Sequence, residues 1–130
     1  MEEHIEKSEE GLLSVKNLTT HYVTREIGTC EAVRNVSFDI HKGETLGLVG
    51  ETGAGKTSIA LSILRLLPVP PAKIVEGEIY WGAKNLLKVH EREMRKIRGG
   101  EISMVFQDPM TSLNPVIPIG DQIEEVVRLH

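Results

Sequence analysis

Apolar and polar residues alternate in two segments near the start of the chain, residues 12–22 and 36–40. A period of two is typical of β-strands that have one face in solvent. A polar turn containing Gly28 follows the first segment, so we expect the two strands to form an antiparallel pair. After the second strand, residues 41–44 (His-Lys-Gly-Glu) are expected to make a tight turn.

Near-continuous apolar runs occupy residues 46–49 and 101–106. Such runs are typical of strands that are buried on both faces of an α/β sheet. Between them, residues 59–67 are apolar on nearly every side of a helix, which predicts a largely buried helix that ends before a proline cluster. Residues 76–81 predict a short strand, and residues 90–100 predict a charged surface helix closed by glycines.

The last part of the chain combines an irregular segment with a helix. Residues 107–120 are irregular, and long segments of this kind tend to be functional. The helix that follows carries Ile123, Val126 and Val127 on one face. Because no later element covers this face, the pattern favours a chain that is cut inside a helical region.

Composition narrows the class of protein. The chain has 130 residues, of which 40% are hydrophobic, and a formal net charge of -4, so it has no general attraction for nucleic acid. Cys30 is the single cysteine, which excludes a disulfide framework within the chain. Residues 1–11 are expected to form a charged tail without the pattern of a secretory signal, and residues 12–130 are expected to be the N-terminal part of one domain. We therefore expect a soluble, cytoplasmic chain.

One segment carries candidate chemistry. Residues 50–57, GETGAGKT, fit the pattern G-x-x-x-x-G-K-[ST] at every fixed position and lie between a predicted strand and a predicted helix. The N–H groups of residues 53–57 are expected to form a cradle for an anion at the start of the helix.

Each side chain at the end of this segment has an expected task. Lys56 is expected to bridge the β- and γ-phosphates of a nucleotide, Thr57 to ligate Mg²⁺, and Ser58 to contact the α-phosphate. A glycine-rich turn with a solvated lysine is the alternative, and the strand-loop-helix context disfavours it. The predicted nucleotide site is formed by Gly50, Glu51, Thr52, Gly53, Ala54, Gly55, Lys56, Thr57 and Ser58.

From residue 13 onward the sequence resembles the ATP-binding subunit of ABC transporters, and within these the peptide and nickel import group. The resemblance rests on the segments LLSVKNLTTHY, AVRNVSFDIHKGETLGLVGETGAGKTS, GEIYWGAKNLL and MRKIRGGEISMVFQDPMTSLNPV. It implies an α/β fold with the P-loop NTPase core of an ABC ATPase and an N-terminal antiparallel β subdomain, truncated in the helical subdomain.

The resemblance also implies roles for two residues outside the phosphate loop. Tyr22 occupies the position of the aromatic residue that stacks on adenine in this family, although an ordinary tyrosine at a strand end is the alternative. Gln107 matches the glutamine that opens the Q-loop, which helps to coordinate Mg²⁺ and the attacking water and leads into a segment that touches the membrane permease. Gln107 and Lys56 are thus the catalytic candidates.

Three parts with which the family hydrolyses ATP are absent from these residues: the LSGGQ-type signature, the Walker B strand with its glutamate, and the switch histidine. We therefore expect weak nucleotide binding and negligible turnover from residues 1–130, and a Mg-ATPase in the full-length subunit. The implied partners are transmembrane permease subunits, a second ATP-binding subunit in a head-to-tail dimer and, indirectly, a solute-binding protein. Nucleic acid is not expected as a partner.

The implied location is the inner face of the cell membrane, with the chain peripheral to it. The sequence leaves open whether the solute is a peptide or nickel, and whether the dimer is homomeric or heteromeric. Two other functions also stay open at this point: a nucleotide-binding fragment without catalytic activity, and an ABC-type ATPase that acts on nucleic acid.

Overall fold

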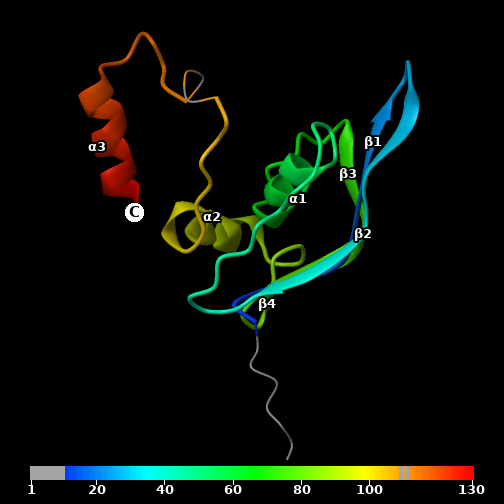
Figure 1. Cartoon of the computed structure of the whole chain (residues 1–130). Helices are drawn as coiled ribbons and strands as arrows, with labels where there is room; N and C mark the ends of the chain where they lie inside the picture. The colour runs from blue at the N-terminus through cyan, green and yellow to red at the C-terminus, as the bar shows by residue number, and fades with distance from the viewer. Residues whose placement is uncertain (1–10, 109, 111) are drawn as a thin grey trace, which may run out of the picture. The chain divides into compact units, whose positions relative to one another are not determined.

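The computed structural model describes residues 11–108, 110 and 112–130. These residues fall into two compact units, of which the first ends at Val89 and the second begins at His90. Nearly all of the predicted tail lies outside the described residues. The first unit contains β1 (Leu13–Thr24), β2 (Gly28–Ile40), α1 (Lys56–Ile63), β3 (Ala72–Trp81) and β4 (Lys84–Asn85). The second contains α2 (Glu91–Gly100) and α3 (Ile119–Leu129) (Figure 1).

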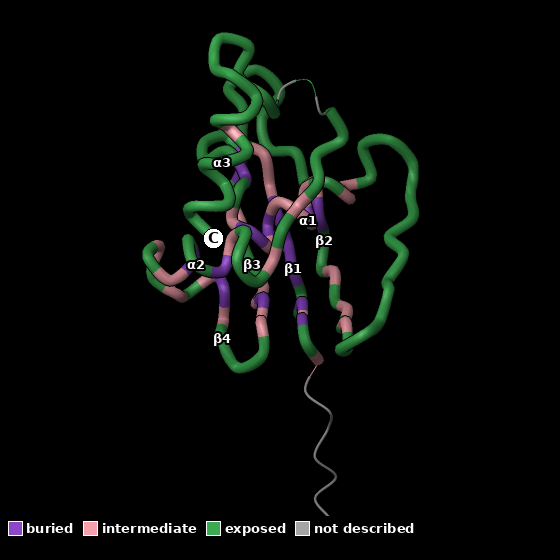
Figure 2. The backbone as a smooth tube through the Cα atoms, turned by 90° about the vertical axis from the view of Figure 1, so that its left-hand side faces the viewer, coloured by how far each residue is buried: buried purple, intermediate pink, exposed green. Residues whose placement is uncertain are grey.

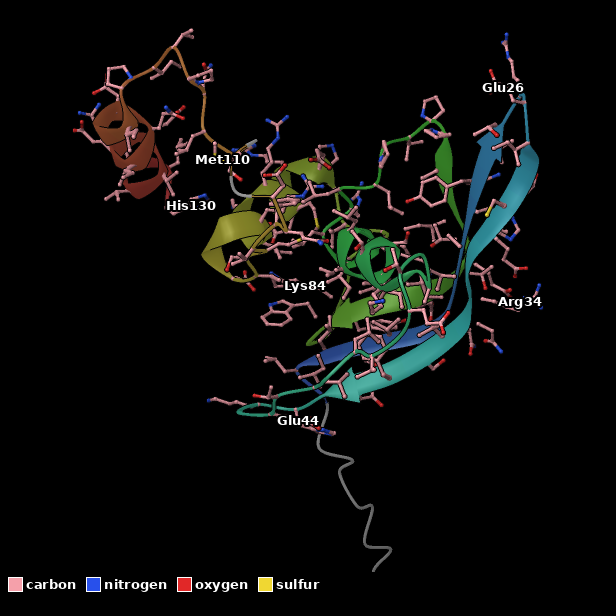
Figure 3. All side chains as sticks on the ribbon, turned by 45° about the horizontal axis from the view of Figure 1, so that its top comes forward. Glu26, Arg34, Glu44, Lys84, Met110 and His130 are labelled. Carbon is pink, nitrogen blue, oxygen red and sulfur yellow. The ribbon has the colours of Figure 1, made fainter. Side chains whose placement is uncertain are left out.

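The sheet of the first unit is antiparallel throughout, with the strand order β2-β1-β3-β4. β1 and β2 form a long hairpin that closes at the pair Thr24↔Gly28, with Glu26 at its tip and Arg34 along β2 (Figure 3). The predicted antiparallel pair is therefore confirmed. β1 also pairs with β3 over most of its length, so it is hydrogen-bonded on both edges.

The apolar core of the first unit lies over the two inner strands. Val15 of β1 stands directly opposite Ile79 of β3, and both side chains are almost fully buried. Cross-strand pairs of this kind are a main source of sheet stability. Buried stretches follow β1 and β3 and recur in α1 (Figure 2). The buried apolar residues of this unit are Leu13, Val15, Leu18, Val33, Ile59, Leu64, Leu67, Ala72, Ile79 and Leu86.

Helix α1 is shorter than the sequence predicts, because the chain leaves the helix at Arg65. This residue has φ 52, in the left-handed region, and its N–H donates to the Ser62 carbonyl at 3.1 Å. Glycine is the usual residue at such a helix end. The guanidinium of Arg65 donates to the carbonyl of Val89 at 2.8 Å and to that of Leu86 at 3.4 Å, and these bonds offset the backbone strain.

Two predicted strands are absent from the structure. Neither residues 46–49 nor residues 101–106 form a named strand, and Val49 and Val105 are each 95% exposed. A strand that is buried on both faces needs a paired neighbour and helices on both sides. Within the described residues, Ile102 makes an isolated bridge to Arg98, and neither segment is paired as a strand.

The second unit contains both predicted helices. In α2, Met94 and Ile97 are fully buried, and the helix breaks at Gly99, whose φ of 81 places it in the left-handed region. The predicted glycine ending is confirmed. No residue of α3 is buried, so its predicted apolar face is uncovered. The Gln122 side chain of α3 bonds to the backbone of Asn114 and Ile117, which ties the preceding irregular segment to the helix.

Candidate functional site

The turn after β2 leads the chain toward the predicted phosphate loop, residues 50–57. The Glu44 N–H donates to the His41 carbonyl at 3.1 Å, and the Glu44 carboxylate accepts in return from the His41 backbone N–H at 2.7 Å. The imidazole Nδ1 of His41 lies 3.0 Å from the same carboxylate oxygen. The backbone bond, and then the imidazole, lower the pKa of Glu44 from its ordinary value. The turn is thus fastened by an ionised carboxylate.

The phosphate loop reverses direction at two glycines. Gly53 has φ 83 and Gly55 has φ 86, both in the region that only glycine adopts readily. The Ala54 N–H donates to the Glu51 carbonyl at 3.1 Å, so this amide closes a turn inside the loop. Helix α1 starts directly afterwards, with Gly55 as its N-cap residue. The segment 51–54 is exposed, so a ligand can reach it from solvent.

The loop is seated on the backbone of β2. A Cβ added to Gly55 would lie 2.3 Å from the Ala32 carbonyl oxygen, which is far inside van der Waals contact. A residue with a side chain at this position would push the start of α1 off the strand. Gly55 therefore serves two purposes: it permits the left-handed backbone, and it lets two segments of backbone meet.

Lys56 is folded back over the loop that precedes it. Its ammonium donates to the carbonyls of Gly50 and Glu51, each at 2.6 Å. Both acceptors are neutral, so neither cancels the positive charge of the ammonium. A lysine ammonium carries three donors. The charge therefore lies beside the first two residues of the loop, and the N-terminus of α1, which begins at Lys56, also favours an anion.

Tyr22 of β1 lies next to the first turn of α1. Its hydroxyl lies 3.2 Å from the Ser58 Oγ, and both residues are partly buried. Thus the residue predicted to stack on the base and the residue predicted to contact the α-phosphate are neighbours, although 36 positions separate them along the chain. The contact joins β1 to α1, and α1 also lies against β2.

The two predicted metal ligands lie in different units. Thr57 is exposed in the first turn of α1. Gln107 is exposed at a bend in the second unit. Across the part of the chain that the structure describes, no group of three or more His, Cys, Asp or Glu residues could hold a metal ion. A metal at this site would depend on hydroxyl, amide and phosphate oxygens.

Sequence reasoning missed two buried hydroxyl residues next to the site, Thr20 and Ser62. Both are fully buried, and the Ser62 hydroxyl donates to the Ser58 carbonyl at 2.6 Å. A signal for Ser62 was present, because it is a polar residue in the middle of an apolar helix. Side chains of this type bond either to the preceding turn or to a neighbouring element.

Comparison with known proteins gives a consistent family. The protein-family model described as ABC transporter matches residues 33–128 of this chain. A probable peptide ABC transporter ATP-binding protein of Sinorhizobium fredii is 52% identical over 119 residues, which cover 92% of this chain and 35% of the relative. The dipeptide transport ATP-binding protein DppD of Bacillus subtilis is 50% identical over 121 residues, covering 93% of this chain and 36% of the relative.

A third relative has a related name. The oligopeptide transport ATP-binding protein OppD of Bacillus subtilis is 47% identical over 119 residues, which cover 92% of this chain and 33% of that protein. The chain thus spans about a third of the length of these relatives. No helix among the described residues is long and apolar enough to cross a membrane.

The seating of the loop can be tested with two matched glycine variants. Gly53 and Gly55 have nearly equal φ values, but a Cβ at Gly53 would meet nothing within 4 Å. Either change to alanine should cost about 1–2 kcal/mol of unfolding free energy for the left-handed backbone. Gly55→Ala should cost about 1–3 kcal/mol more, because its methyl group collides with Ala32. Urea unfolding of the full-length protein measures both, and equal losses would contradict the close approach.

Proposed function

The chain belongs to the ABC transporter family, and on this premise we propose that it forms the ATP-binding part of a subunit that drives the import of short peptides. The observation that carries the proposal is the geometry of Lys56. Its ammonium is held over the phosphate loop by two neutral carbonyls, at 2.6 Å each, at the start of a helix. An uncancelled cation in this position is suited to a polyphosphate.

When ATP binds, Lys56 would exchange its hydrogen-bond acceptors. Lys56 would leave the carbonyls of Gly50 and Glu51 for the β- and γ-phosphate oxygens, which are charged and form stronger hydrogen bonds. The loop amides and the N-terminus of α1 would add their partial positive charge. Tyr22 would hold the adenine by stacking, which contributes about 1–3 kcal/mol for a base on an aromatic ring.

The donor set near the loop fits a magnesium ion. Thr57 offers an exposed hydroxyl one residue after Lys56, and Mg²⁺ prefers oxygen ligands together with substrate phosphates. When bound, the ion neutralises charge on the β- and γ-phosphate oxygens. Gln107 would contribute an amide oxygen and orient the attacking water. We propose that Lys56, Thr57 and Gln107 take part in ATP hydrolysis. The signature, Walker B and switch-histidine parts of the family are not among residues 1–130, so we assign hydrolysis to the full-length protein.

The names of the relatives support a proposal for the substrate and the partners. The relatives described above are named as ATP-binding proteins of peptide, dipeptide and oligopeptide transport, so we propose peptides and not nickel as the solute. The subunit would pair head to tail with a second ATP-binding subunit, contact the transmembrane permease through the segment after Gln107, and depend indirectly on a solute-binding protein. It would be peripheral on the inner face of the cell membrane. The net charge of -4 argues against nucleic acid as a partner.

Replacing the lysine tests the phosphate assignment. We expect Lys56→Ala in the full-length protein to weaken the binding of a fluorescent ATP analogue by roughly ten- to a hundredfold, since it removes charged hydrogen bonds. Uptake of a labelled dipeptide by cells carrying this variant should fall to background. Lys42→Ala, at an exposed turn outside the loop, is the matched control and should bind like the wild type. Equal affinities for all three proteins would overturn the assignment.

The magnesium assignment is tested by removing one hydroxyl without changing the size of the side chain. Thr57→Val should lose most of the gain in ATP affinity that Mg²⁺ gives to the wild type, while its affinity in EDTA stays the same. Thr29→Val, at an exposed position of β2, should keep the full gain. Titrations of ATP with and without Mg²⁺ measure the difference. A Thr57→Val protein that retains the metal-dependent gain would rule out Thr57 as a ligand.

A further inference from the structure

Two pairs of hydroxyl groups join β1 to α1. Thr20 Oγ1 lies 3.5 Å from Ser62 Oγ, and the Tyr22 hydroxyl lies 3.2 Å from Ser58 Oγ. Residues two apart in a strand point to the same side, and residues four apart in a helix lie one above the other. The four residues therefore form two successive rungs between the strand and the helix, which we call the hydroxyl ladder.

The inner rung fixes the helix against the strand. Thr20 and Ser62 are both 0% exposed, so their hydroxyls have no access to water. A buried hydroxyl without a partner is costly, so the Thr20 hydroxyl favours a placement of α1 that keeps Ser62 Oγ within its reach. Ser62 also donates to the Ser58 carbonyl at 2.6 Å, so the inner rung holds the backbone of the residue that forms the outer rung.

The outer rung lies at the predicted nucleotide site, and both of its members are partly buried. We propose that the Tyr22 hydroxyl positions the Ser58 hydroxyl for the α-phosphate, so that Tyr22 recognises the base with its ring and the phosphate through Ser58. This inference rests on the proposed function, since it requires a nucleotide in the loop. It gives Tyr22 a positioning role in addition to stacking, and it distinguishes tyrosine from other aromatic residues at this position.

The direction of the hydrogen bonds explains how Tyr22 positions the Ser58 hydroxyl. The Ser58 hydroxyl has one proton and can accept a second bond at its oxygen. When Tyr22 donates to Ser58 Oγ, the serine proton is left for a phosphate oxygen. A chain from tyrosine to serine to phosphate then forms, in which each bond polarises the next. Phenylalanine at position 22 would stack equally well but would leave the serine without this donor.

A double-mutant cycle on the full-length protein tests the inference. The affinity for ADP, which avoids turnover, is measured by calorimetry for the wild type, Tyr22→Phe, Ser58→Ala and the double variant. Tyr80→Phe is the matched control, because Tyr80 lies on β3 with its ring 5.3 Å from the Lys16 ammonium. Thermal melting of the nucleotide-free proteins confirms that each variant is folded at the temperature of the titration.

We expect Tyr22→Phe and Ser58→Ala each to weaken ADP binding by about three- to tenfold, in keeping with the loss of one hydrogen bond. Because both changes break the same chain, the double variant should be no weaker than Ser58→Ala alone, and Tyr80→Phe should match the wild type. Three results would overturn the inference: unchanged or higher affinity in Tyr22→Phe, losses that add in the double variant, or an equal loss in Tyr80→Phe. Absence of ADP and ATP binding in the wild type would instead refute the proposed function itself.

Discussion

The phosphate loop depends on the contact between its own backbone at Gly55 and the Ala32 carbonyl of β2. At this point the chain must turn through a left-handed conformation and start a helix while it lies against a strand. Only glycine satisfies both requirements. The N-terminus of α1 is thereby fixed on the sheet, and the ammonium of Lys56 is placed over the loop that precedes it. The packing of the backbone therefore builds the site and positions its side chains.

The sheet and the far end of α1 support this loop. β1 is hydrogen-bonded along both edges, and its buried residues pack with β3 into the core of the unit. The far end of α1 is held by the guanidinium of Arg65, which bonds to the carbonyls of Leu86 and Val89. Between these anchors the hydroxyl ladder sets the position of Ser58. The exposed segment 51–54 is thus a ligand-accessible loop on a fixed frame, as a preorganised anion site requires.

Sequence patterns predict those features that depend on neighbouring residues in the chain. The β1–β2 hairpin follows from alternation, the helix break at Gly99 from the two glycines at positions 99 and 100, and the phosphate loop from the spacing of its fixed positions. Features that depend on distant partners were predicted wrongly or missed. The apolar runs 46–49 and 101–106 have the composition of buried strands, but strand formation also needs a paired edge. The end of α1 at Arg65, and the contact of Tyr22 with Ser58, are set by residues far along the chain.

The most direct measurement is a crystal structure of the full-length protein with a non-hydrolysable ATP analogue and Mg²⁺. The account predicts that the Lys56 ammonium leaves the carbonyls of Gly50 and Glu51 and contacts the β- and γ-phosphates, with the adenine against the Tyr22 ring. It would be contradicted by a nucleotide bound elsewhere, with Lys56 still donating to both carbonyls.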